Sequence, residues 1–144
     1  MSSTTATALN YANHVENSLG GVSLYASANV TADAQGTAVM AGRGWYQIVT
    51  TMTAIEVASS DELYIVDIEA NTADTTSTWY RLATVAAVGA NNVTGRTDDD
   101  TARTFVAAVF NPYDYQIRVT FSLVGTTNDS TGITVAVEAF PLPI

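Results

Sequence analysis

The sequence lacks or has few of the residues that carry much of enzyme chemistry. Among its 144 residues there is no cysteine, no lysine and a single histidine, His14. Without cysteine there is no disulfide, no thiolate metal site and no cysteine nucleophile. Without lysine there is no Schiff base and no P-loop lysine. One histidine alone cannot build a zinc site, so we expect no metal and no cofactor.

The remaining residues form no recognisable catalytic constellation. A Ser-His-Asp triad would need His14, which lies in a polar segment, and the sequence contains no Gly-x-Ser-x-Gly motif. The one dense carboxylate run is Asp98–Asp100. Oxygen ligands suit calcium, but adjacent carboxylates in an extended loop point in different directions, and no calcium-loop pattern follows. This run therefore favours a solvated loop over a cation site, and we expect no catalytic residues and no enzyme activity.

Positive charge is also scarce. Five arginines stand against 14 acidic residues, which gives a net charge of −9 at pH 7. So few cations cannot neutralise many phosphates, and we expect no nucleic-acid binding. Anionic membrane surfaces are disfavoured for the same reason, and the apolar runs are much shorter than a membrane span, so we expect no membrane partner. The acidic surface serves solubility or docking on a basic protein surface.

What the sequence does have is alternation with a period of two. Apolar residues at odd positions from Tyr115 to Leu123 alternate with polar ones, which predicts a half-buried antiparallel strand with the odd positions in the core. Leu63–Ile68 is apolar nearly throughout, as in a central strand. Trp45–Val57 is apolar at both parities, which indicates burial on both sides or a bulge that switches faces. Further strands are expected at Val22–Leu24, Ala28–Val30, Thr37–Met40, Trp79–Val88, Thr104–Phe110 and Ile133–Glu138, with polar connections at Asn71–Ser77 and Gly89–Thr104.

About eight strands with connections of varied length predict an all-β fold. We expect an antiparallel β-sandwich, jelly-roll-like, with an N-terminal arm. Residues 1–20 are polar and weakly patterned and form the arm, and residues 21–140 form the sandwich domain. Residues 141–144 form a tail that is expected to leave the sheet, because its prolines cannot donate hydrogen bonds.

Two pairs of aromatic residues occur in predicted strands, Trp45-Tyr46 and Trp79-Tyr80. Neighbouring side chains on a strand point to opposite faces, so each pair places one ring inside the domain and one outside. Outward rings can stack on sugars, and tryptophan and tyrosine are also enriched at protein interfaces. A carbohydrate-binding or adhesin-like sandwich therefore stays open as one interpretation of this chain.

The C-terminal strands carry a resemblance to a known family. The segments are Arg103–Phe110, a strand that opens on Tyr115-Gln-Ile-Arg118, and a final strand from Ile133 to Ala139. This pattern, over roughly residues 60–144, resembles tailed-bacteriophage capsid decoration (cement) proteins. The resemblance implies a small non-enzymatic β-domain that sits on the assembled shell and clamps neighbouring capsid subunits.

The same resemblance implies partners and a location. The partner would be the major capsid protein, and the chain would form a dimer or trimer on the outer capsid surface of the virion, after a cytoplasmic stage in the host during assembly. Apolar residues of the terminal segments are the candidate partner contacts, because ordering these segments has to be offset by burial. These residues are Leu9, Tyr11 and Val15 in the arm, and Phe140, Leu142 and Ile144 at the C-terminus.

Overall fold

The computed structural model describes residues 21–56, 62–91, 96–97, 102–124 and 132–143. Every regular element within these ranges is a β-strand, so the predicted all-β class is confirmed. In the part of the chain so described, no helix is long and apolar enough to cross a membrane. The predicted arm, residues 1–20, lies outside the described residues.

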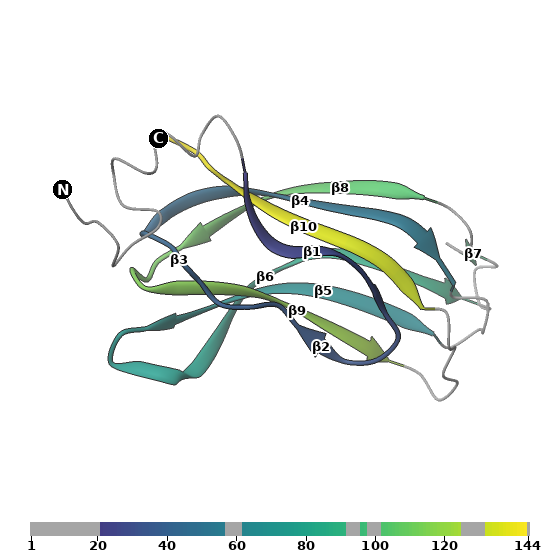
Figure 1. The fold of residues 1–144 in the computed structure, drawn as a ribbon, viewed down its shortest axis with the longest axis horizontal. Helices are drawn as coiled ribbons and strands as arrows, with labels where there is room; N and C mark the ends of the chain where they lie inside the picture. Colours follow the sequence, from purple (N-terminus) through teal and green to yellow (C-terminus); the bar gives the residue numbers. More distant parts are fainter. Residues whose placement is uncertain (1–20, 57–61, 92–95, 98–101, 125–131, 144) are drawn as a thin grey trace.

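Two antiparallel sheets face each other, forming the upper and lower layers in Figure 1, as in a β-sandwich. We call them sheet A and sheet B. Sheet A contains, in spatial order, β1 (Val22–Val30), β10 (Ile133–Pro141), β4 (Gly44–Ile55) and β8 (Arg103–Asn111). Sheet B contains, in spatial order, β2 (Ala34–Gln35), β9 (Gln116–Val124), β5 (Leu63–Thr72), β6 (Thr75–Asn91) and β7 (Arg96–Thr97), with β3 (Val39–Met40) also paired to β9.

The alternating strand predicted from Tyr115 to Leu123 is β9, and its core face is largely as expected. Ile117, Val119 and Phe121 are buried between the sheets. Tyr115, which precedes the first residue of β9, and Leu123 are only half-buried. The predicted central strand is β5, which lies between β9 and β6 and extends four residues further, to Thr72.

The mixed apolarity of β4 comes from a bulge. Tyr46, Ile48 and Met52 are buried at even positions, and Ile55 is then buried at an odd one. The pairing of β4 with β10 shifts by one residue between Met52 and Ala54, which leaves Thr53 as the extra residue. The bulge alternative is therefore correct, and it turns Trp45 and Val49 to the outside of sheet A.

Two predicted connections are shorter than expected. β5 runs to Thr72 and β6 begins at Thr75, so a tight turn replaces most of the loop predicted at Asn71–Ser77. The Thr72 side-chain oxygen accepts a hydrogen bond from the Thr75 backbone N–H at 3.1 Å. Within the connection predicted at Gly89–Thr104, β6 continues to Asn91 and β7 pairs back onto it. Both segments were predicted as loops because of their polar composition. Threonine, however, also favours strands, so a threonine-rich segment can be part of a sheet.

The C-terminal segment stays in the sheet for longer than predicted. β10 continues to Pro141, which lies opposite Tyr46, and the N–H of Leu142 donates to the Trp45 carbonyl at 3.0 Å. Successive N–H groups of a strand point to opposite edges. An N–H at position 141 would therefore point away from β4, so Pro141 costs this pairing no hydrogen bond. The prediction that the tail leaves the sheet at the first proline is wrong.

Candidate interaction surface

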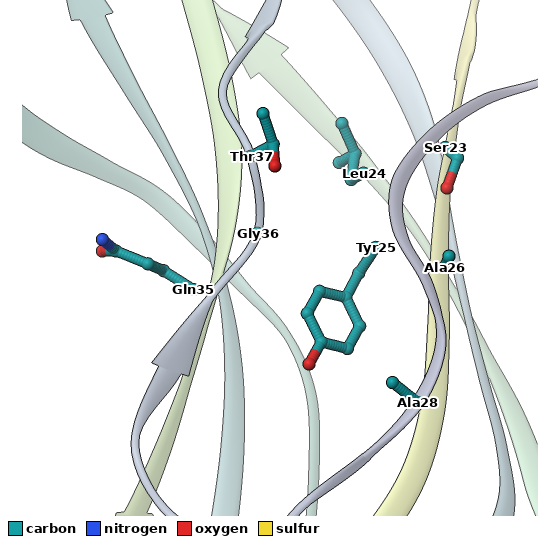
Figure 2. A pocket seen from close by; sticks show the side chains of 8 residues that line it. All are labelled: Ser23, Leu24, Tyr25, Ala26, Ala28, Gln35, Gly36 and Thr37. Atoms are coloured by element: carbon teal, nitrogen blue, oxygen red, sulfur yellow. The ribbon is translucent and has the colours of Figure 1, made fainter.

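A pocket of about 380 Å³ lies where edge strand β1 of sheet A approaches β2 of sheet B. Figure 2 shows the Tyr25 side chain between β1 and the segment Gln35–Thr37, and its ring packs edge-on against Phe121, with 4.7 Å between ring centroids. Glycine at position 36 allows the two sheets to approach closely here, because a side chain at this position would collide with the Leu24 carbonyl oxygen. The Tyr25 phenol is the one ionisable group in the lining, so the pocket offers no acid–base pair.

The described residues also hold no group of three or more histidine, cysteine, aspartate or glutamate side chains that would bind a metal ion. The residues for which the sequence raised that question, His14 and Asp98–Asp100, lie outside the described ranges.

The outer face of sheet B carries an ion pair stacked on an aromatic ring. The Arg118 guanidinium contacts Glu69 Oε1 through Nε and Nη2, both at 2.9 Å, and its Cζ lies 4.1 Å from the centre of the Trp79 ring. Charge-assisted hydrogen bonds and a cation–π contact thus hold the same side chain. The arginine of the Tyr-Gln-Ile-Arg pattern is therefore engaged within its own sheet, and it covers one face of Trp79.

Other polar groups on this face are also paired with one another. Asp67 accepts a hydrogen bond from the Thr84 hydroxyl at 2.5 Å and lies 3.8 Å from the Arg81 guanidinium. Further along β5, the Asn71 amide donates to the Gln116 side chain at 2.9 Å. These contacts tie β5, β6 and β9 together. They give the outer face of sheet B a structural role in holding its strands in register.

The outer face of sheet A is different, because large apolar side chains are exposed on it. Val106 is 59% exposed, Trp45 41% and Phe110 37%. Trp45 lies opposite Phe110 in the ladder between β4 and β8, and Val49 lies opposite Val106. The Trp45 and Phe110 rings are 5.3 Å apart and tilted by 53°. Gln47 and Ala108 lie between these two pairs. Several large apolar side chains exposed on one face, aromatic rings among them, are typical of protein interaction sites. We call Trp45, Val49, Val106, Phe110 and Phe140 the apolar face.

Two of the predicted partner-binding residues border or join this face. Phe140 lies in β10 opposite Gln47, and its ring packs closely over Gly21. The N–H of Leu142 is bonded to the Trp45 carbonyl, and the side chains of Phe140 and Leu142 are both half-buried. They belong to sheet A rather than to a free tail. The other predicted contacts, Leu9, Tyr11, Val15 and Ile144, lie outside the described residues.

The sequence did not single out Val106 and Phe110 as binding residues. The available signal was apolarity at both parities of β8, where Val109 is buried while Val106 and Phe110 face outward. Alternation alone does not separate such a strand from one that is buried on both sides. The face became recognisable only when the partners of β8 were known.

The two aromatic pairs behave differently. Tyr46 is buried and Trp45 is exposed, so the inside–outside prediction is confirmed for this pair. In the second pair the two rings are also on opposite faces, but neither is buried. Trp79 is half-buried beneath Arg118 on the outer face, whereas Tyr80, opposite buried Ala70, is exposed and packs on Tyr113 at 5.3 Å.

Buried Tyr46 is expected to make the stability of the domain sensitive to alkaline pH. Burial, reinforced by the charge of Asp114, raises the pKa of Tyr46 to about 12 from its ordinary value of 10.0. A folded-state pKa above the unfolded one means that the stabilisation is complete below pH 10 and is lost as pH rises toward 12. We expect the free energy of unfolding to fall between these pH values by up to about 1.4 kcal/mol per pH unit from this group.

Urea unfolding at pH 8 and at about pH 11 measures this loss, with Tyr46→Phe as the control. The variant loses the hydrogen bond from the phenol to the Gly42 carbonyl, 2.6 Å long, and is expected to be less stable at pH 8 by about 1 kcal/mol. It should lose less stability than the wild type on going to high pH. An equal loss in both proteins would contradict the assignment.

Comparison with protein-family models finds no match for this chain, and comparison with curated proteins finds none either. Family membership therefore supplies no function, and the chemistry of the surfaces has to carry the assignment.

Proposed function

We propose that the chain is a structural protein that binds other proteins through the apolar face of sheet A, and that its partner is the capsid shell of a tailed phage. The observation that carries the proposal is the exposure of Trp45, Val106 and Phe110 on one face of a regular sheet, with Trp45 beside Phe110. The strand pattern of the C-terminal half, which resembles that of capsid decoration proteins, favours the shell as the partner.

The position of the face in the sheet suits this role. Trp45 lies on β4, which is paired on both sides, to β10 and to β8. A ring held on such a strand loses little freedom on binding, so more of the burial energy contributes to affinity. A standard interface buries on the order of 800 Å² per partner, and many copies on one shell act together through multivalency. The net charge of −9 favours a basic partner surface.

The proposal includes jelly-roll wiring of the two sheets. The chain passes repeatedly from one sheet to the other, and the first and last strands of sheet A, β1 and β10, pair with each other. Connections that cross between two facing sheets are a feature of Greek-key and jelly-roll domains. The same wiring occurs in viral capsid domains and also in lectin domains, so it does not by itself choose between the two candidate functions.

The aromatic geometry gives less support to a carbohydrate-binding module. Sugar stacking uses the open faces of rings, and one face of Trp79 is covered by Arg118. Trp45 and Phe110 are tilted by 53° and do not form a flat platform. The apolar face therefore suits a protein surface better than a glycan.

The test is co-sedimentation of the chain with capsids from the same source as the sequence, purified without this chain. The double variant Trp45→Ser/Phe110→Ser is expected to bind at least about tenfold more weakly, because interface aromatic residues contribute most of the binding energy. Its secondary structure should be unchanged, since both side chains face outward.

The matched control is Tyr80→Ser, which removes an aromatic side chain of similar exposure, 39%, from sheet B. It should bind capsids like the wild type. Equal binding of the double variant and the wild type, or no binding by the wild type, would reject the proposed function.

A further inference from the structure

The edge of sheet A formed by β8 differs from the other sheet edges in the described part of the chain. An open edge is a template for pairing with another strand, and proteins usually blunt it with bulges or short strands. The opposite edge of sheet A is β1, whose pairing with β10 shifts register twice. In sheet B, β2, β3 and the N–H of Gly36 pair with the outer side of β9. β7 pairs with only the last two residues of β6, and the pairing of β6 with β5 shifts register three times. β8 pairs with β4 over nine residues without a shift.

The hydrogen bond from Leu142 to Trp45 establishes which backbone groups of β8 point away from β4. The Trp45 carbonyl accepts a hydrogen bond from Leu142, which follows β10. The backbone N–H and C=O groups of odd-numbered β4 residues therefore point toward β10, and those of even-numbered residues point toward β8. The even-numbered residues lie opposite odd-numbered residues of β8, such as Tyr46 opposite Val109. The N–H and C=O groups of the even-numbered β8 residues therefore point away from β4. These residues are Thr104, Val106, Ala108 and Phe110.

We propose that β8 pairs antiparallel with β8 of a second copy of this chain, with the two-fold axis at Ala108. An axis perpendicular to a continuous sheet keeps each residue on its own face, so outward residues pair with outward residues and the axis passes through one residue. With the axis at Ala108, Val106 of each copy lies opposite Phe110 of the other. With the axis at Ala107, Phe110 would lie opposite Thr104 and Val106 opposite Ala108.

The second copy is the occupant because this edge is complementary to itself. In the register centred on Ala108, the residues from Val106 to Phe110 pair only apolar side chains with apolar ones, and two of the most exposed, Val106 and Phe110, cover each other twice. Three pairs of residues would form about six backbone hydrogen bonds. No charged residue lies between Thr104 and Phe110, so the contact buries no charge. The net charge of −9 on each copy opposes association at long range, and salt should weaken this repulsion.

The dimer extends the proposed function. Its role at a capsid shell rests on the proposal that the chain binds that shell. Pairing through β8 joins two four-stranded sheets into one eight-stranded sheet. The Trp45 side chains stay on the outer surface, and two apolar faces become one continuous surface. Two linked faces bind a repeating surface more tightly than one, because the second contact is intramolecular.

The first experiment measures the mass of the chain alone by sedimentation over a series of concentrations. The wild type is expected to reach twice the 15.2 kDa of one chain. Ala108→Pro removes an N–H that points away from β4 and changes an exposed side chain, so the variant should fold and remain a monomer. Val106→Lys should also remain a monomer, because the lysine would face Phe110 of the other copy.

The matched control is Val124→Lys, which places the same charge at a valine of similar exposure, 51%, on β9 of sheet B. This variant should dimerise like the wild type. A wild type that stays monomeric at every concentration, or a Val106→Lys variant that dimerises equally well, would overturn the proposal.

A second experiment tests the register with engineered cysteines, since the chain has none. In Ala108→Cys the two thiols would lie opposite each other, with about 5.5 Å between Cα atoms, within the range of a disulfide. In Thr104→Cys the two thiols would be about 27 Å apart along the strands, at about 3.4 Å per residue. Mild oxidation should cross-link the first variant and not the second. Cross-linking of Thr104→Cys alone would overturn the register.

The two proposals fail separately. A dimer in solution that does not bind capsids would reject the capsid role and leave the β8 pairing intact. Capsid binding by a chain that is monomeric in solution and unaffected by Ala108→Pro would reject the pairing and leave the capsid role intact.

Discussion

Val119→Asp is expected to abolish the folded state of the domain. Val119 is completely buried on β9, opposite Ile68 of β5 in the middle of sheet B. An aspartate there would be a buried charge without a partner, which costs several kcal/mol even when the group becomes protonated. That penalty is comparable to the total stability of a small domain, about 5–15 kcal/mol. Circular dichroism during thermal or urea unfolding should show no cooperative transition for the variant.

The matched control is Val124→Asp, which makes the same change at the solvent-exposed end of the same strand. It should shift the unfolding midpoint little, because the carboxylate stays in water. Wild-type melting of Val119→Asp would show that the assignment of the core face of β9 is wrong.

Gly132→Ala is expected to produce the largest loss of stability among conservative substitutions at the described glycines. Gly132 has a φ of 61°, a conformation that costs residues with a Cβ about 1–2 kcal/mol. A methyl group at this position would also collide with the carbonyl oxygen of Val30 and lie 3.0 Å from Thr31 Cα. Backbone atoms cannot move aside cheaply, because Val30 pairs with Ile133 in the ladder between β1 and β10. We expect a total loss of at least about 3 kcal/mol.

Gly44→Ala separates the two causes. Gly44 also has a positive φ, 148°, but no atom lies within 4 Å of the position that a Cβ would take. This variant should lose only the conformational part, about 1–3 kcal/mol. Urea unfolding of both variants gives the comparison, and equal losses would show that the contact with Val30 is relieved without cost.

The two outer faces show how one architecture produces different surfaces. Sheet B covers its outer face with paired polar groups, such as Glu69 with Arg118 and Asp67 with Thr84. Sheet A leaves apolar side chains exposed and ends in the regular edge strand β8. A binding surface on sheet A can therefore change by substitution with little effect on the strand pairing that holds the domain together.

Local sequence patterns were enough to determine the class of fold and much of the core. A period of two is a property of the strand itself, so the alternation around Ile117, Val119 and Phe121 predicted the buried face of β9 before any partner strand was known. The missing cysteine and lysine, with a single histidine, likewise excluded several kinds of chemistry by composition alone.

The tertiary structure decided where the period changes and which outer face stays apolar. The bulge at Thr53 exists only relative to β10, and Pro141 is tolerated only because its missing N–H points away from β4. Arg118 covers Trp79 because β5 lies between their strands and supplies Glu69. Such contacts join residues far apart in the chain, and their geometry depends on strand order and register, which a local pattern of apolar and polar residues does not encode.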